Sequence, residues 1–273
     1  MNYNGELGIN RIMQPGMSIA SFLRLASRCG FSSIELRNDL PDDRVLGDES
    51  AADIMTVSRE TGVRILTVNA MQRFNDPQLF DRKIIELGQL IYEAKQVNCS
   101  RIIFCPVNDP KDRRGAAEQQ DDLVAALQCY APTLRQHSVT ALLEPLGFPI
   151  CSMRFKRQAA DAIRESGLHR VYGIVHDTFH HYLSGETELF PEETGLIHTS
   201  GVRPGKEMSE ITDDDRIFVD ADDCMGNREQ IAAMIAQGYG GPISYEPFSR
   251  EVQEMSEREV ESRLRASLAY LFG

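Results

Sequence analysis

The stretch YGIVHD at residues 172–177 is a short apolar run that ends in a residue able to bind a metal ion, and three other stretches share this design. They are ALLE at residues 141–144, GLIH at residues 195–198 and ISYE at residues 243–246. Continuous apolar runs of this length are typical of parallel strands that are buried on both faces. Each run ends in a residue that can bind a metal ion, namely Glu144, Asp177, His198 or Glu246. The sequence therefore predicts four parallel strands with ligand-bearing carboxyl ends.

Strand-like runs of this kind alternate with amphipathic, helix-like segments along the chain. The predicted strands are residues 6–9, 33–37, 64–69, 101–106, 140–144, 172–177, 196–199 and 243–246. The predicted helices are a segment from Ser18 to Gly30, one that ends at Gly62, and residues 77–97, 116–136, 158–166, 180–190, 228–237 and 257–271. Uninterrupted alternation favours a closed α/β barrel, a (β/α)8 TIM barrel, that occupies residues 1–273 as one domain.

Composition narrows the class of protein. The chain of 273 residues is 42% hydrophobic and carries a formal net charge of −12. Nucleic-acid binding needs a positive surface, so we expect no nucleic-acid partner. No apolar run approaches the roughly 20 residues that span a bilayer, and no secretory signal opens the chain, so we expect no membrane partner and a cytoplasmic location. The six cysteines form no CxxC pair and are expected to be reduced.

Each of the four strand-end residues also has an ordinary structural explanation. Glu144 and Glu246, which both precede a proline, would form salt bridges at the ends of strands. Asp177 would cap the next helix, and His198 would simply be a polar strand end. In a (β/α)8 barrel, however, the carboxyl ends of all strands meet on one face, where active sites lie. We therefore favour convergence of the four side chains on one divalent cation.

The chain resembles the xylose isomerase-like TIM barrel superfamily over nearly its whole length. The superfamily includes sugar epimerases, hydroxypyruvate isomerase, inosose-metabolising enzymes and a zinc-dependent endonuclease. Within it, the sequence is most similar to 2-keto-myo-inositol (inosose) isomerase. The residues that carry this closer resemblance are 30–37, 67–70, Phe74-Asn75, 143–151 and 173–180. The strand-end ligands are typical of the superfamily, whereas Asn69-Ala70 and the Gly147-x-Pro149-x-Cys151 pattern favour the inosose isomerase subgroup.

The resemblance implies roles for particular residues. Glu144, Asp177, His198 and Glu246 match the metal ligands of the family, and Glu144 and Glu246 also match its two catalytic glutamates. Three further positions match or border substrate-binding residues, namely Asn69, His180 and Arg216. The implied cofactor is one divalent cation. Three oxygens and one nitrogen favour Mn²⁺ and also suit Mg²⁺, Co²⁺ or Zn²⁺.

Two segments depart from the family pattern. Relatives usually follow the arginine at Arg216 with a Pro-Gly-x-Gly loop, whereas this chain reads IFVDAD at residues 217–222. Relatives also commonly place an acid near the ligand histidine, whereas Thr199, Ser200 and Gly201 follow His198 here. Both departures bear on the identity of the substrate more than on metal binding.

The implied activity is a metal-dependent isomerisation of a ketose-like polyol, most specifically inosose, in inositol catabolism. A glutamate would remove the proton next to the carbonyl, and the cation would stabilise the resulting enediolate. The partner is then a small polyol or sugar, and the sequence leaves open whether the protein forms a homo-oligomer.

Five other interpretations remain open at this stage. A sugar epimerase, hydroxypyruvate isomerase or inosose dehydratase would use the same scaffold. An endonuclease is disfavoured because it needs a basic groove and more histidines, and the chain has only six. A non-catalytic sugar-binding barrel is disfavoured by the presence of both Glu144 and Glu246.

Overall fold

Eight parallel strands close into a barrel in the computed structural model of the chain, which describes residues 3–40 and 44–273. Each strand pairs with the next, and β1 also pairs with β8, which places Leu7 opposite Ile243 and closes the ring. The strands are β1 (Leu7–Asn10), β2 (Ser33–Arg37), β3 (Arg64–Gln72), β4 (Arg101–Cys105), β5 (Thr140–Leu143), β6 (Tyr172–Asp177), β7 (Thr194–Thr199) and β8 (Ile243–Tyr245). The predicted (β/α)8 barrel is confirmed.

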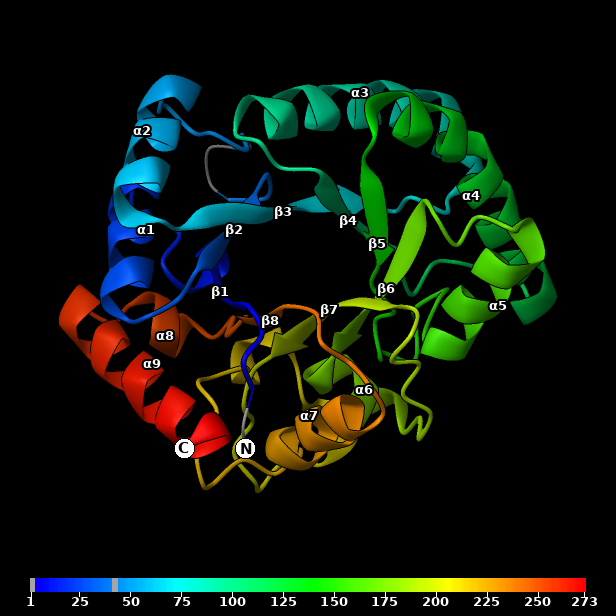
Figure 1. Cartoon of the computed structure of the whole chain (residues 1–273). Coiled ribbons are helices and arrows are strands. Elements are labelled where there is room, and N and C mark those ends of the chain that lie inside the picture. The colour runs from blue at the N-terminus through cyan, green and yellow to red at the C-terminus, as the bar shows by residue number, and fades with distance from the viewer. Residues whose placement is uncertain (1–2, 41–43) are drawn as a thin grey trace.

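Helices form an outer layer around the ring of strands (Figure 1). They are α1 (Ile19–Arg28), α2 (Ala51–Thr61), α3 (Phe80–Gln96), α4 (Ala116–His137), α5 (Lys156–Ser166), α6 (Thr178–Ser184), α7 (Asn227–Ala236), α8 (Arg250–Gln253) and α9 (Glu257–Phe272). Ser18 caps α1 by accepting a hydrogen bond from the Ser21 backbone, and Gly62 ends α2 in the left-handed conformation. These termini agree with the helix signals in the sequence.

The helix after β6 differs from the predicted one. We expected it over residues 180–190, but α6 spans Thr178–Ser184 and begins directly after the strand. It starts early because the side chain of Asp177 accepts a hydrogen bond from the Phe179 backbone N–H and so caps the helix. It ends early because Gly185 adopts a left-handed conformation with φ of 69°.

The interior of the barrel is an apolar plug below the carboxyl ends of the strands. Successive residues of a strand point to opposite sides of the sheet. Leu196 belongs to an interior cluster, whereas the next residue, Ile197, joins the larger core between strands and helices. The other members of the interior cluster are Leu66, Ala70, Ile103, Cys105, Leu142 and Val175. Residues two positions farther along the strands, such as His198, therefore lie above this plug on the same side.

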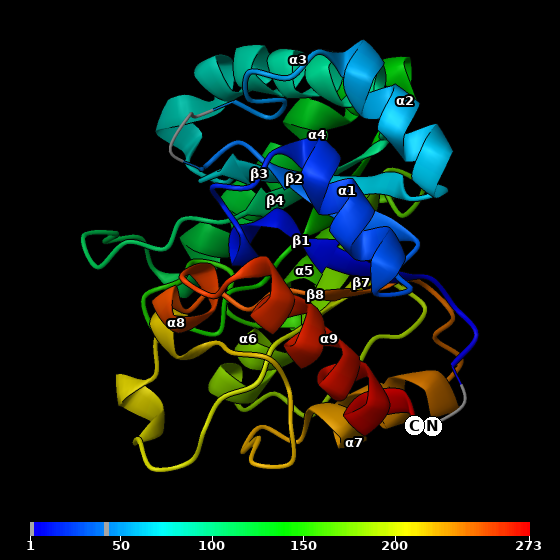
Figure 2. The same ribbon diagram turned by 90° about the vertical axis from the view of Figure 1, so that its left-hand side faces the viewer.

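The two chain ends lie side by side (Figures 1 and 2), where the ring of Tyr3 stacks on that of Phe272 with centroids 5.7 Å apart. The segments that follow β4 and β7 extend on one common side of the barrel in Figure 2. All six cysteines are free, as the sequence predicts. Among the helices of residues 3–40 and 44–273, none has the length and apolarity that a membrane span requires.

Candidate metal centre and active site

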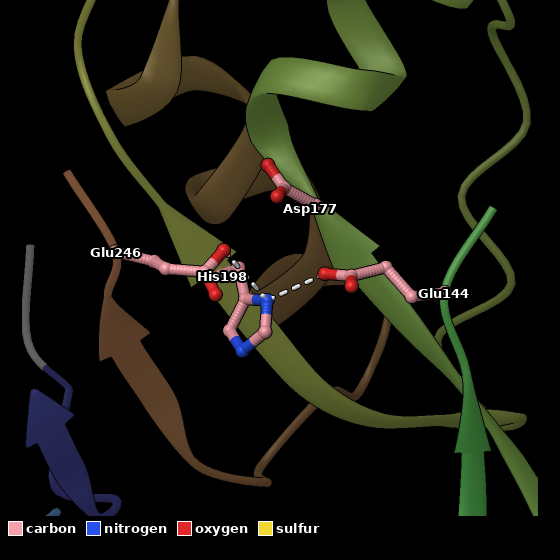
Figure 3. Close-up of side chains that lie close together, drawn as sticks. All are labelled: Glu144, Asp177, His198 and Glu246. Carbon is pink, nitrogen blue, oxygen red and sulfur yellow. Dashed lines mark hydrogen bonds and ion pairs between the residues drawn. The ribbon is translucent and has the colours of Figure 1, made fainter. Parts of the chain in front are cut away.

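Glu144, Asp177, His198 and Glu246 meet at the carboxyl ends of four successive strands, β5 to β8 (Figure 3). One potential ligand atom from each of the four side chains lies within 4.8 Å of those from the other three, and all four residues are buried. The closed barrel thus brings together four residues that are up to about a hundred positions apart in the sequence. The strand pairing supplies the common frame on which they are held.

Glu144 and Glu246 occupy equivalent positions on their strands. Glu144 directly follows β5 and Glu246 directly follows β8, and each is followed by a proline. Proline has no backbone N–H, so the pairing of the strand ends there and the chain turns away. By the alternation of side chains, Glu144 points to the same side as Leu142 of the interior plug. Each glutamate is therefore directed into the mouth of the barrel.

Asp177 has two structural partners at once. Its Oδ1 accepts a hydrogen bond of 2.8 Å from the Phe179 backbone, which caps α6. Its Oδ2 lies 2.8 Å from Nη2 of Arg216 and belongs to the cluster of four. The helix-cap and cluster interpretations of this residue are therefore compatible, because the cap holds the carboxylate at the end of β6.

His198 contacts carboxylates on both sides of its ring. Nδ1 lies 2.7 Å from Oε1 of Glu144 and 3.2 Å from Oε2 of Glu246. Nε2 lies 3.1 Å from the carboxylate of Glu35, which the strand β2 contributes. Burial by itself lowers the pKa of His198, but the three carboxylates outweigh it and raise this pKa well above its usual value. In the absence of a cation, the ring is thus the positive centre of a negative cluster.

Two arginines balance the remaining negative charge. Nη2 of Arg216 lies 2.9 Å from Oε2 of Glu246, and Nη1 of Arg37 lies 2.9 Å from Oε1 of the same carboxylate. Asn10 also donates a hydrogen bond of 2.9 Å to Oε1 of Glu246. Glu246 is therefore held from both of its oxygens, which fixes its orientation.

The two glutamates differ in their protonation behaviour. Burial raises the pKa of Glu144 by itself, yet the contact with His198 brings that pKa down to about 2. Burial raises the pKa of Glu246 to about 7, although His198 and Arg216 oppose this shift. Two neighbouring carboxylates that cannot both ionise freely show this divergence.

The donor set fits a divalent cation. Three carboxylates and one imidazole are hard to borderline ligands, suited to Mn²⁺, Mg²⁺, Co²⁺ or Zn²⁺. Four protein ligands also leave coordination positions for substrate oxygens in an ion that accepts five or six ligands. A divalent cation would add to the two arginines in offsetting the repulsion among these buried carboxylates.

A cavity of about 430 Å³ opens over the cluster, which is large enough for a six-carbon polyol. Its lining includes all three residues that we expected to contact substrate, and six of its residues bear on function: Asn69, Glu144, Phe148, His180, Arg216 and Glu246. Nδ1 of His180 is buried and has no hydrogen-bond partner among the described residues. Its Nε2 lies 3.9 Å from Oδ2 of Asp177. His180 thus lines the cavity and carries a buried polar atom that has no partner among the described residues.

Sequence reasoning assigned no role to Glu35, Arg37 or Asn10, although they complete the site from β1 and β2. Glu35 and Arg37 are two residues apart near the end of β2, so both point into the barrel. Both are buried, as is Asn10 at the end of β1. Polar residues at alternate positions of an otherwise apolar strand were the available signal, because a buried charge needs a partner.

The two segments that depart from the family pattern, residues 199–201 and 217–222, contact each other. Gly201 and Ile217 form an antiparallel bridge, with backbone hydrogen bonds of 2.7 and 2.8 Å. Nε of Arg216 donates a hydrogen bond of 3.0 Å to the Ser200 hydroxyl. The segment after β7 therefore holds the segment that carries Arg216, which keeps this guanidinium at the cluster without a Pro-Gly loop.

Comparison with known proteins places this site in a family context. The family model described as "Xylose isomerase-like TIM barrel" matches residues 23–271. An inosose isomerase of Bacillus velezensis (strain DSM 23117 / BGSC 10A6 / LMG 26770 / FZB42) is 23% identical over 257 residues, which are 87% of this chain and 86% of that protein. The resemblance inferred from the sequence is confirmed.

Solved structures agree with the same fold. A xylose isomerase domain-containing protein from Salmonella typhimurium LT2 superposes with a TM-score of 0.92 at 31% identity and covers 100% of both chains. The IOLI protein, whose crystal structure contains a zinc atom, superposes with a TM-score of 0.87 at 19% identity. That match covers 97% of this chain and 98% of the IOLI chain.

Proposed function

Because the chain belongs to the xylose isomerase-like TIM barrel family, we propose that it is a divalent-metal-dependent isomerase of a ketose-like polyol. The proposed substrate is 2-keto-myo-inositol (inosose), since the matching relative from Bacillus velezensis is an inosose isomerase. The observation that carries the proposal is the buried cluster of three carboxylates and one imidazole beneath the cavity. The cytoplasmic location and the place in inositol catabolism stay predictions.

In this proposal, Glu144, Asp177, His198 and Glu246 hold one divalent cation. When bound, such a cation acts as a Lewis acid on a carbonyl oxygen, which is worth several kcal/mol to the reaction. The donor set favours Mn²⁺, and the zinc atom in the IOLI structure makes Zn²⁺ an equally direct first choice for experiments.

The two glutamates would move the proton. Moving a carbonyl to the neighbouring carbon requires removal of the proton on that carbon, and a positioned carboxylate accelerates this step about 10²–10⁴-fold. Glu144 and Glu246 both line the cavity and approach His198 Nδ1 at 2.7 and 3.2 Å. One of them would take the proton to leave an enediolate, and the same or the other glutamate would return it to the adjacent carbon.

Other lining residues would orient the polyol. Asn69, His180 and Arg216 line the cavity and offer polar groups to hydroxyl oxygens. Phe148 and Phe248 supply apolar surface on the cavity wall, which reduces access of water to the reacting carbons. This mixture suits a neutral polyhydroxylated ring.

An epimerase would use the same glutamates, with the proton returned to the same carbon from the opposite face. An endonuclease with several metal ions is disfavoured, because His176 and His181 contact groups outside the four-residue cluster. Nδ1 of His176 lies 2.8 Å from Nζ of Lys156, and the ring of His181 packs at a tilt of 44° against that of His176, with centroids 4.8 Å apart. Neither belongs to the four-residue cluster.

The test is turnover by the purified protein across inososes, ketohexoses and hydroxypyruvate, followed by NMR. Each substrate is assayed after chelation and after addition of Mn²⁺, Mg²⁺, Co²⁺ or Zn²⁺. We expect a positional isomer of inosose to form, and only in the presence of metal. An epimer at the same carbon would identify an epimerase, loss of water would identify a dehydratase, and inactivity with every substrate and metal would contradict the proposal.

A further inference from the structure

The ring of His198 is held on its Nε2 side, opposite to the cluster, by a third carboxylate, that of Glu35. Nε2 lies 3.1 Å from Oε1 and 3.1 Å from Oε2 of Glu35. Glu35 comes from β2, which β8 and β1 separate from β7 in the barrel, and neither side chain has exposed surface. The same ring presents Nδ1 to Glu144 and Glu246. One nitrogen therefore faces the candidate ligands, and the other faces Glu35.

Glu35 is itself surrounded by hydrogen-bond donors. Nδ2 of Asn69 donates to Oε2 at 3.0 Å, and the Thr67 hydroxyl donates to the same oxygen. Nδ2 of Asn10 lies 3.4 Å from Oε1. Since every one of these neighbours donates, only a group that accepts at both oxygens satisfies them. The surroundings therefore select an ionised carboxylate and fix its orientation.

We propose that Glu35 is a positioning residue, which keeps a proton on Nε2 of His198 and thereby directs the Nδ1 lone pair toward the metal. The inference rests on the proposed metal-binding function and adds to it the atom through which His198 binds. A metal-bound imidazole has one nitrogen for the ion and one for a proton, and an acceptor at the second nitrogen sets the tautomer. Such an acceptor typically contributes 10–100-fold to metal affinity.

The first test is Glu35→Gln. An amide keeps the size of the side chain, but its NH₂ group would face donors, so it cannot accept from all of its neighbours. We expect zinc affinity, measured by competition with a chromophoric chelator, to fall by about 10–100-fold relative to the wild type.

Glu186→Gln is the matched control. Glu186 is a largely buried carboxylate that accepts from the backbone of Lys156 and Arg157, not from His198, so its replacement should leave zinc affinity unchanged.

The second test needs no variant. Long-range ¹H–¹⁵N spectra of the zinc-loaded wild-type protein should show His198 coordinated through Nδ1, with a proton retained on Nε2. Zinc on Nε2 would overturn the assignment, as would wild-type affinity in a folded Glu35→Gln protein. If the wild type binds neither zinc nor any other tested divalent cation, the proposed function fails and the role of Glu35 fails with it. Zinc binding that is insensitive to Glu35→Gln would remove the role of Glu35 alone.

Discussion

Arg216 places Nη2 2.8 Å from Oδ2 of Asp177, so a guanidinium forms a buried ion pair with a candidate metal ligand. The same nitrogen lies 2.9 Å from Oε2 of Glu246. The guanidinium also lies over the rings of Phe179 and Phe248, 4.8 and 4.5 Å from their centroids. The protein thus carries a fixed cation beside the cluster, which reduces the repulsion among its carboxylates with or without a metal ion.

The first prediction concerns the stability that this cation provides. Arg216→Met keeps much of the apolar volume but leaves Asp177 without its buried arginine, whereas Glu246 retains Arg37. Removal of one partner from a buried ion pair costs about 3–5 kcal/mol, so we expect a loss of this size in urea unfolding of the chelated protein. Zinc should raise the melting temperature of Arg216→Met more than that of the wild type, because it neutralises the same carboxylates.

The matched control for this experiment is Arg203→Met. Arg203 pairs with Glu251 at 2.9 Å, but both side chains are about half exposed, and exposed pairs contribute at most about 1 kcal/mol. A loss in Arg216→Met no larger than that of the control would show that the buried pair is not needed for the fold.

The second prediction concerns the ligand set. Glu144→Gln and Asp177→Asn keep the size of each side chain but remove the negative charge that attracts a cation, so both should lower divalent affinity sharply. Metal content after dialysis, measured by elemental analysis, should fall well below one ion per chain in each variant. Glu49→Gln serves as the control, because Glu49 accepts from the backbone at the start of α1, outside the site. Full metal content in both test variants would refute the assignment.

The sequence predicted the barrel because its strand signal is local. The runs that end at Asp177 and Glu246 are apolar, short and followed by a break, which is sufficient to identify buried parallel strands. Eight such units leave few alternatives to a closed barrel. The convergence of four ligand residues then follows from the fold, since all strand ends meet on one face.

The sequence could not show which polar residues of β1 and β2 complete the site. Glu35 and Arg37 lie at alternate positions of β2, a pattern that indicates buried polar residues but does not identify their partners. Their contacts with His198 and Glu246 join residues more than 160 positions apart. Such contacts depend on how β2 is placed relative to β7 and β8 in the closed barrel, and no local sequence pattern contains that information. The early start of α6 was missed because Asp177 was interpreted as either a helix cap or a metal ligand. In the structure, one oxygen of Asp177 caps α6 and the residue also belongs to the four-residue cluster.

The third prediction concerns a buried lysine behind the site. Burial lowers the pKa of Lys156 to about 7, although Glu186 and Glu188 oppose this shift. Its unfolded pKa is about 10.4, so between these values the unfolded chain binds more protons than the folded protein. The stability of the wild type relative to Lys156→Met should therefore rise with pH between about 7 and 10, by at most about 1.4 kcal/mol per pH unit.

Urea unfolding of both proteins across this pH range provides the measurement for Lys156. Taking the difference between the two proteins removes the common effects of tyrosines and cysteines. The neighbouring His176 has a pKa that burial lowers well below its usual value, so its titration falls below this range. A flat difference between pH 7 and 10 would show that Lys156 titrates normally in the folded protein.

The last prediction concerns the chemistry. If an inosose isomerises through an enediolate, the hydrogen next to the carbonyl must be carried by a side chain that can exchange it with solvent. Turnover in D₂O should then place deuterium on the carbon next to the carbonyl, or, where the site excludes water, transfer the original hydrogen to the neighbouring carbon. Glu246→Gln should suppress both outcomes by at least about two orders of magnitude, the usual contribution of a positioned base.

Because Glu246 is also a candidate ligand, the comparison is made at matched metal occupancy, verified by elemental analysis. Retention of the hydrogen through a hydride shift would show neither wash-in of deuterium nor a loss on Glu246→Gln at matched occupancy, and the two glutamates would then be metal ligands only.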